Sequence, residues 1–385
     1  MGNPAAPGGA GTSNAPVGAG RGGAQNTGIT PGATAGAAGE GNTNVTPITP
    51  GAGGSGNTGA NGGSGNAGTN GGAQGNVDPP GGDGGFVSLD VNGGPSAAFV
   101  CPEGVTFGNP LTGMGAVTSV AAPQGSFFAF IEGPVWVGSV NKLFFSDNAS
   151  GPERIWQISP PFTTPSIFMP DSGSNGLAID NDDQLLLADQ SDNRITRVTN
   201  TAPATVSGTL LPTGAPRPND LIMRSDDNVY FTDPDTGGRG LYRLSPTGQL
   251  SGPFIQANTM NAPGAPNGVV LSPDENTLYV GDVQQNFVAS FELLEDGSID
   301  TASGQRFTET RGNTVDGMAV DCAGNLYVGV NNGVEVYAPD KTFIGTVPVG
   351  EASNATFGGA DRRTLFVTSR SVLKFVTLAV PGLPD

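Results

Sequence analysis

Six polar side chains recur along the sequence at intervals of 38 to 49 residues, each at the start of an apolar stretch. They are Glu132, Asn175, Asn219, Asn267, Asp316 and Asn354. Carboxylate and amide oxygens bind hard cations, first Ca²⁺, with Mg²⁺, Mn²⁺ or Zn²⁺ as alternatives. If the fold brings these side chains together, burying them without a partner would be costly, and a cation would remove that cost. The alternative is that each residue only caps the turn before its strand.

The absence of histidine excludes several other kinds of chemistry. Without His there is no Ser-His-Asp or Cys-His site, no HExxH zinc site and no His general base. Cys101 and Cys322 lack CxxC spacing and cannot build a thiolate zinc or iron–sulfur site. They are either two buried thiols or one disulfide, and the scarcity of Lys and the composition of the tail favour the disulfide. Catalysis must therefore use carboxylates, amides, hydroxyls, Arg or a metal ion held by oxygen.

The polar residues open six copies of one pattern, in which two apolar stretches flank a polar turn. The copies are 132–147, 175–189, 219–233, 267–282, 316–330 and 354–369. Asp and Asn in these turns favour hairpins, and a second, weaker pair of strands follows most copies. Four strands in about 45 residues is typical of a propeller blade. The sequence thus predicts an all-β, six-bladed β-propeller, rather than a β-sandwich or barrel, with residues 98–107 as a possible ring-closing strand.

The N-terminal part has a different composition from the rest. Residues 1–86 hold 29 of the 63 Gly, no Leu, and one aromatic residue, Phe86. Such a segment cannot bury enough apolar area to offset chain entropy, so we expect a disordered tail or spacer over 1–86 and a catalytic propeller over 87–385. The start has neither the basic nor the apolar region of a signal peptide. The spacer nevertheless resembles that of a secreted, periplasmic or surface-tethered protein.

The net charge of −18 argues against partners that need a basic surface, above all nucleic acid and anionic membranes. The sequence has no run of 18 apolar residues, so it predicts no transmembrane segment. We expect a monomer that acts on a small molecule.

The repeats resemble the gluconolactonase, senescence-marker-protein and regucalcin group of six-bladed propellers over about residues 125–378. The resemblance depends on the order and spacing of six motifs. These are EGPVW (132–136), RPND (217–220), FTDP (231–234), APNGVVLSPDENTLYVGD (265–282), DGMAVDCAGNLYV (316–328) and NATFGGADRRTLFVTS (354–369). The resemblance implies a lactonase, which is a carboxylic ester hydrolase.

The resemblance also assigns roles to individual residues. It implies a divalent-metal site formed by Glu132, Asn219, Asn267 and Asp316, with Asp316 as general base. Arg217 and Asn175 would contact the substrate, together with Asn219. Related paraoxonases use His as a base, so the absence of His excludes that mechanism here.

The implied reaction is hydrolysis of a sugar or aliphatic lactone by a metal-polarised carbonyl and a water that a carboxylate activates. Asp233 and Asp282 are fallback candidates for the base, although each could simply cap its hairpin. Arg217 could bind substrate or form a surface ion pair. The alternative function is a non-catalytic ligand-binding propeller, or a calcium-stabilised propeller displayed on a surface.

Overall fold

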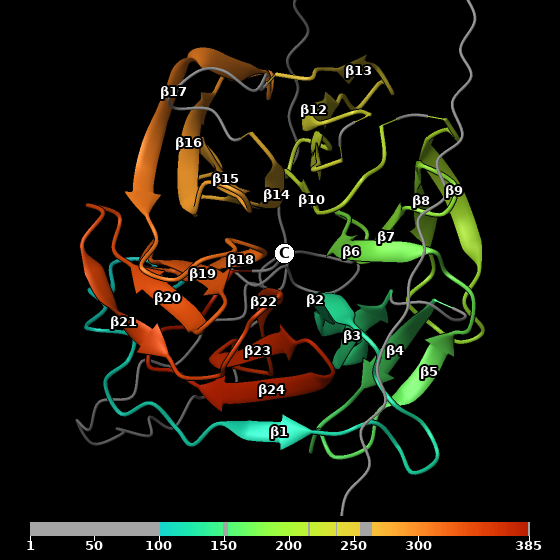
Figure 1. Ribbon diagram of the computed structural model, residues 1–385, viewed down its shortest axis with the longest axis vertical. Helices are drawn as coiled ribbons and strands as arrows, with labels where there is room; N and C mark the ends of the chain where they lie inside the picture. Colours follow the sequence, from blue (N-terminus) through green and yellow to red (C-terminus); the bar gives the residue numbers. More distant parts are fainter. Residues whose placement is uncertain (1–100, 149–152, 215, 236, 255–263, 384–385) are drawn as a thin grey trace, which may run out of the picture. The chain divides into compact units, whose positions relative to one another are not determined.

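The computed structural model describes residues 101–148, 153–214, 216–235, 237–254 and 264–383. These residues form six four-stranded antiparallel sheets around a common axis, and their one helical element is the short 3-10 turn Gly138–Val140 (Figure 1). The prediction of an all-β six-bladed propeller is therefore confirmed. The predicted spacer, residues 1–86, lies outside the described residues. No helix in the described part is long and apolar enough to cross a membrane.

Each blade places its strands in order from the axis outward. The innermost strands are β2 (Ile131–Val137), β6 (Ser174–Ile179), β10 (Leu221–Met223), β14 (Pro266–Leu271), β18 (Met318–Val320) and β22 (Asn354–Gly358). The second strands are β3 (Lys142–Asp147), β7 (Leu185–Asp189), β11 (Val229–Asp233), β15 (Thr277–Asp282), β19 (Leu326–Val330) and β23 (Thr364–Ser369).

The third strands are β4 (Arg154–Ile158), β8 (Arg194–Val198), β12 (Gly240–Leu244), β16 (Phe287–Leu293), β20 (Gly333–Tyr337) and β24 (Val372–Thr377). The outer strands are β5 (Ser166–Met169), β9 (Val206–Leu211), β13 (Leu250–Ser251), β17 (Ile299–Glu309), β21 (Phe343–Val347) and β1 (Thr118–Val120). The innermost strands contact one another in a closed cycle, from β2 through β6, β10, β14, β18 and β22 back to β2.

The turns between the first and second strands follow from the sequence. Each contains at least one residue with a positive φ, a conformation that Gly, Asn and Asp adopt at little cost. The residues just before the second strands are Asn141, Asp183, Asp227, Glu275, Gly324 and Arg362, and the last turn also has Gly359. The polar turn clusters therefore predicted the hairpins correctly, although two of these left-handed positions are held by Glu and Arg.

The ring closes because the last blade takes its outer strand from the start of the described chain. Strand β1 pairs with β24, with Thr118 opposite Phe375 and Val120 opposite Leu373. The prediction of residues 98–107 as the closing strand was wrong in position, because residues 101–107 form no strand and 98–100 lie outside the described residues. With β1 in place the last sheet has four strands like the other five, and β24 is not left as an exposed sheet edge.

Apolar side chains fill the space between neighbouring blades. The second strands lie in the middle of each sheet, and β7, β11 and β19 are buried at every position. At the junction of the first and last blades, the Trp136 ring stacks on Phe366 with ring centroids 6.0 Å apart. The blade interfaces thus hold the strands rigidly, so the residues at the axial ends of the innermost strands have fixed positions.

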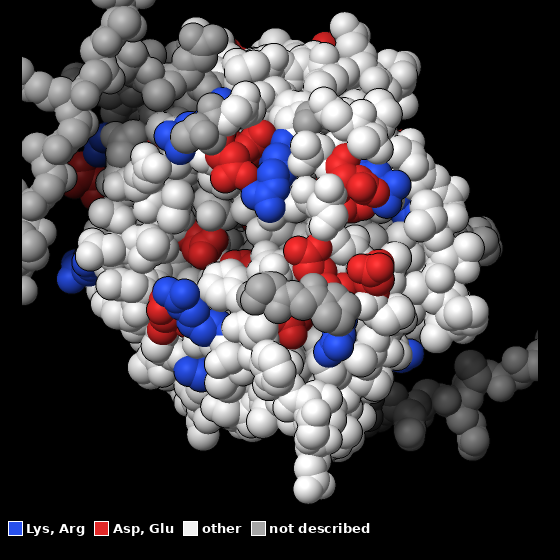
Figure 2. Space-filling model, turned by 45° about the vertical axis from the view of Figure 1, so that its right-hand side comes forward, with Lys and Arg blue, Asp and Glu red and all other residues white. Residues whose placement is uncertain are grey.

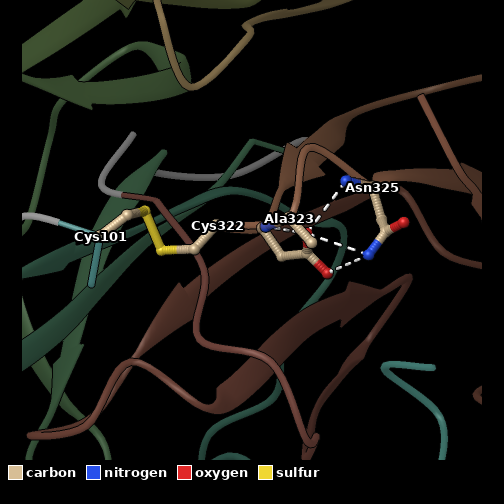
Figure 3. The surroundings of a disulfide bond; sticks show 5 residues. Cys101, Cys322, Ala323 and Asn325 are labelled. Atoms are coloured by element: carbon tan, nitrogen blue, oxygen red, sulfur yellow. Dashed lines mark hydrogen bonds between the residues drawn. A yellow bond between two sulfur atoms is a disulfide. The ribbon is translucent and has the colours of Figure 1, made fainter. Parts of the chain in front are cut away.

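A disulfide joins Cys101 to Cys322, which are 221 positions apart, with Cα atoms separated by 5.4 Å (Figure 3). Of the two alternatives left by the sequence, the structure shows the disulfide. Cys322 lies in the turn between β18 and β19, where the Asp321 carboxylate accepts hydrogen bonds from the N–H groups of Ala323 and Asn325. The Cys322 N–H also donates to Pro381 O. The disulfide therefore links the segment at Cys101 to the β18–β19 turn, and the C-terminal segment at Pro381 contacts the same turn.

We predict that the double variant Cys101→Ser/Cys322→Ser unfolds with a free energy about 2–4 kcal/mol lower than the wild type, because the disulfide closes a long loop in the unfolded chain. Urea denaturation monitored by tryptophan fluorescence measures this difference. Adding dithiothreitol should destabilise the wild type and leave the double variant unchanged. Equal stability of the two proteins under oxidising conditions would show that the cross-link contributes nothing.

Candidate functional site

The six recurring polar residues lie at one end of the innermost strands, and the residue after each one explains how closely the strands approach. In four blades this residue is Gly: Gly133, Gly176, Gly268 and Gly317. A Cβ atom on Gly133 would lie 2.6 Å from Asn175 O, and one on Gly268 would lie 2.2 Å from Asp316 O. Only Gly permits this approach, so each polar residue is held beside its neighbour in the next blade.

Hydrogen bonds between blades fix the backbone of these polar residues. The Gly176 N–H donates to Asn219 O at 2.8 Å, the Ser146 hydroxyl to Asn175 O at 2.5 Å and the Thr232 hydroxyl to Asn267 O at 2.5 Å. Because these bonds use backbone oxygens, they leave the amide side chains unengaged. Within the described residues, no hydrogen bond is recorded for the side chains of Asn175, Asn219, Asn267 or Asp316.

Glu132 belongs to the first blade and Asp316 to the fifth, but the two side chains influence each other electrostatically. The pKa of Glu132 is raised well above its usual value by burial, and further by the negative charges of Asp316 and Asp220. The pKa of Asp316, which is half-buried, is also raised by burial and then by Asp220 and Glu351, with Arg370 opposing the shift. These axial carboxylates destabilise one another as anions, so a positive charge would be favourable among them.

These carboxylates also lack the ion pairs found elsewhere. Figure 2 shows several Lys and Arg side chains lying directly beside Asp or Glu, and recorded pairs include Arg194–Asp189 and Arg224–Asp226. None of the ion pairs recorded among the described residues includes Glu132, Asp220 or Asp316. Among the described residues these carboxylates thus form no ion pair, although the charge of Arg370 partly offsets that of Asp316.

Asp220 is a member of this cluster that the sequence reasoning missed. Its Oδ2 accepts a hydrogen bond from Val269 N in the next blade at 3.3 Å, and its Oδ1 accepts one from Leu221 N at 3.1 Å. Burial raises the pKa of Asp220 to about 7, although hydrogen bonds from Val269, Leu221 and Asn354 oppose the shift. The sequence did contain a signal for Asp220. Four other copies have Gly at this position and the last has Ala355, so a carboxylate here departs from the repeat.

Arg217 and the two fallback bases have partners away from the axial side chains. The Arg217 Nη1 pairs with Asp235 Oδ2 at 2.5 Å, and its backbone N–H donates to Asp233 at 2.8 Å. Asp233 also accepts from Asp235 N, and Asp282 accepts from Gln284 N and Gln285 N at 2.7 and 2.6 Å. Asp233 and Asp282 therefore act as hairpin caps, and the recorded bonds of Arg217 are with the loop after β11.

A cation site at the axis would have to use amides as well as carboxylates. Among the described residues, no three Asp, Glu, His or Cys side chains lie close enough to form a metal site. The predicted set of Glu132, Asn219, Asn267 and Asp316 meets this requirement, because it combines two carboxylates with two amides that have no recorded hydrogen-bond partner. These donors consist only of oxygen, which fits a hard divalent cation.

Comparison with known proteins gives one family and several similar proteins. The model of the SMP-30/Gluconolactonase/LRE-like region matches residues 130–371. A gluconolactonase of Zymomonas mobilis is 29% identical over 289 residues, covering 64% of this chain and 78% of that protein. The pentonolactonase XacC of Haloferax volcanii is 28% identical over 246 residues, covering 62% and 80%. The structure of a gluconolactonase from Xanthomonas campestris superposes with a TM-score of 0.55 at 27% identity, covering 66% and 88%.

The raised pKa of Asp220 predicts how stability depends on pH in the presence of EDTA. An unfolded Asp titrates near 3.9, so between about pH 4 and 7 the folded state holds a proton that the unfolded state has lost. The free energy of unfolding should therefore fall as pH rises through this range. Asp220→Asn should reduce that fall, as measured by urea denaturation at each pH.

A matched control is Asp340→Asn. Hydrogen bonds from Thr342 lower the pKa of this exposed residue, so its small contribution has the opposite sign and lies at lower pH. If Asp220→Asn and the wild type lose stability equally between pH 4 and 7, Asp220 does not titrate as we predict.

Proposed function

The chain belongs to the SMP-30/Gluconolactonase/LRE-like family, and we propose that it is a metal-dependent lactonase that hydrolyses a sugar or aliphatic lactone. The observation that carries this proposal is the position of the predicted ligands. Glu132, Asn219, Asn267 and Asp316 all fall within the matched residues 130–371, at one end of the innermost strands. The gluconolactonase and pentonolactonase relatives support the lactone as substrate class.

The four ligand candidates would hold one divalent cation, for which Ca²⁺ is the first choice. Two carboxylates keep the site negative, and the two amides add neutral oxygens without further repulsion. When bound, the cation would polarise the lactone carbonyl and offset the negative charge that develops on its oxygen. A hydrogen bond from Gly133 N to Oε2, at 3.2 Å, orients the Glu132 carboxylate, which is one of the proposed cation ligands.

Asp316 is the proposed general base. Without a cation, the pKa of Asp316 is raised by burial and then by the charges of Asp220 and Glu351. Asp316 would take a proton from the water that attacks the lactone carbonyl carbon. The ring C–O bond then breaks, and the proton passes to the leaving oxygen to give a hydroxy acid.

Asn175 and Asn219 are proposed to orient the substrate. Their side-chain amides have no recorded hydrogen-bond partner, while their backbone oxygens accept bonds from Ser146 and Gly176. Each amide can donate to a substrate oxygen and accept from a substrate hydroxyl. Arg217 could join them with the guanidinium N–H groups that its pair with Asp235 leaves, because both side chains are about half exposed.

The disulfide supports a location outside the cytosol. Structural disulfides persist in oxidising compartments and are rare in the cytosol. Together with the composition of residues 1–86, the Cys101–Cys322 bond leads us to propose a secreted, periplasmic or surface-tethered protein.

We predict that the protein hydrolyses at least one member of a panel of aldonolactones and aliphatic lactones, and that EDTA abolishes this activity until Ca²⁺ is restored. Asp316→Asn should lower kcat by about 10²- to 10⁴-fold, because it removes the base and one anionic ligand. Hydrolysis is followed by pH-indicator absorbance.

The exposed residue Asp340 offers the control variant Asp340→Asn, which should keep full activity. Binding of Ca²⁺ without turnover of any lactone would instead favour a ligand-binding or calcium-stabilised propeller. Full activity in Asp316→Asn would remove Asp316 from the mechanism.

A further inference from the structure

Arg370 lies in the turn between β23 and β24, beside the first residues of the opening blade. Its backbone oxygen accepts a hydrogen bond from Ile131 N at 2.7 Å. Ile131 immediately precedes Glu132, so this bond fixes the turn next to a predicted metal ligand. The Arg370 turn therefore has a defined position at the rim of the axial site.

The guanidinium of Arg370 has two recorded neighbours at this rim. It pairs with the carboxylate of Glu351, and it lies 5.5 Å from the centroid of the Phe130 ring. Glu351 stands three residues before β22, and its backbone oxygen accepts a hydrogen bond from the Ser369 hydroxyl at 2.5 Å. The Arg370 and Glu351 side chains are 59% and 38% exposed. The pair is thus anchored by its backbone while its polar ends remain accessible.

The Arg370–Glu351 pair also acts on the proposed base. Glu351 raises the pKa of Asp316 and Arg370 lowers it. The pKa of Arg370 is raised mainly by its hydrogen bond with Glu351, and the charge of Asp316 adds to that shift. Such mutual effects require that the pair and Asp316 lie within a short electrostatic range. In contrast, the recorded partners of Arg217 are Asp233 and Asp235.

We propose that Arg370 and Glu351 form a substrate subsite at the rim that binds the hydroxyl groups of a polyhydroxylated lactone. This inference deepens the proposed function and rests on it. The guanidinium has five N–H donors and Glu351 has two acceptor oxygens, so the recorded pair leaves groups of both kinds for a ligand. A hydroxyl both donates and accepts, and it can therefore bridge the two side chains.

The charge around the subsite favours a neutral substrate. Glu351 balances the charge of Arg370, so the ion pair as a whole is neutral. An anionic substituent would have to compete with Glu351 for the guanidinium, whereas a hydroxyl group can donate to Glu351 and accept from Arg370 at once. An unsubstituted aliphatic lactone would gain nothing from the pair.

The test compares two lactones with the same ring size, D-glucono-1,5-lactone and δ-valerolactone, which has no hydroxyl groups. Arg370→Gln and Glu351→Gln should each raise KM for gluconolactone by about tenfold, because a charged hydrogen-bond partner of the substrate is lost. The same variants should change kcat/KM for δ-valerolactone much less than for gluconolactone. The effect of the pair on the pKa of Asp316 is common to both lactones, whereas only gluconolactone has hydroxyl groups to lose their contacts. Arg370→Lys should show an intermediate KM, since it keeps the charge and loses the planar fork.

Arg306→Gln is the matched control. Arg306 pairs with Glu309 and lies over the Phe287 ring at 4.1 Å, but it belongs to the outer strand β17. It should change neither substrate's kinetics. Equal losses on both lactones, or none on gluconolactone, would overturn the subsite.

A binding measurement separates this inference from the proposed function. D-Glucono-δ-lactam has an amide in place of the ester, and calorimetry with it needs no turnover. Arg370→Gln should weaken lactam binding about tenfold and leave 2-piperidone binding unchanged. Loss of lactam binding in a protein that hydrolyses no lactone would keep the subsite and reject the lactonase. If the protein hydrolyses a lactone but Arg370→Gln leaves lactam binding unchanged, the lactonase is kept and the subsite is rejected. A wild type that binds no lactam would also reject the subsite.

Discussion

The close approach of the innermost strands at the axis is the constraint on which the rest of the structure depends. The Cα of Gly317 lies so near the next blade that an added Cβ would be 1.9 Å from the Asn354 side chain, and Gly268 is almost as crowded. Six strands can meet in this way only if the residue after each axial polar group is small, as it is in five of the six blades. The exception is Asp220. The blade interfaces then fix the polar groups at one end of the ring, because the packed sheets around them cannot shift independently.

This constraint produces an electrostatic problem that the described chain does not solve with its own residues. Glu132, Asp220 and Asp316 are brought within electrostatic range, and none of them forms an ion pair among the described residues. The charge of Arg370 only partly offsets that of Asp316. In the absence of a cation, protonation relieves the repulsion, as the raised pKa values indicate. A divalent cation would relieve it while leaving the carboxylates ionised, so cation binding and folding stability should be linked in this protein.

The sequence predicted the architecture because the periodic signal is strong, but it could not predict features that depend on contact between distant segments. The hairpins follow from turns such as those at Asp183 and Asp227, and the six-fold repetition follows from their spacing. The closing strand was misplaced because β1 has only three residues, of which two are exposed, so it has almost no hydrophobic pattern. Asp220 was missed because its burial comes from contacts with Val269 and Asn354, which lie in other blades.

The junction between the last and first blades joins the stability of the ring to the proposed chemistry. Here Trp136 stacks on Phe366, Ser353 donates to Ile131 O at 2.9 Å, and the Arg370 turn accepts from Ile131 N. Glu132 follows directly after Ile131, which accepts the first of these bonds and donates the second, so slippage at this seam would move a predicted ligand. The Arg370 side chain, in contrast, is largely exposed on a turn, where it pairs with Glu351. A propeller of this kind can therefore keep its ligand ring constant while the exposed turns at the rim alter which substrate is bound.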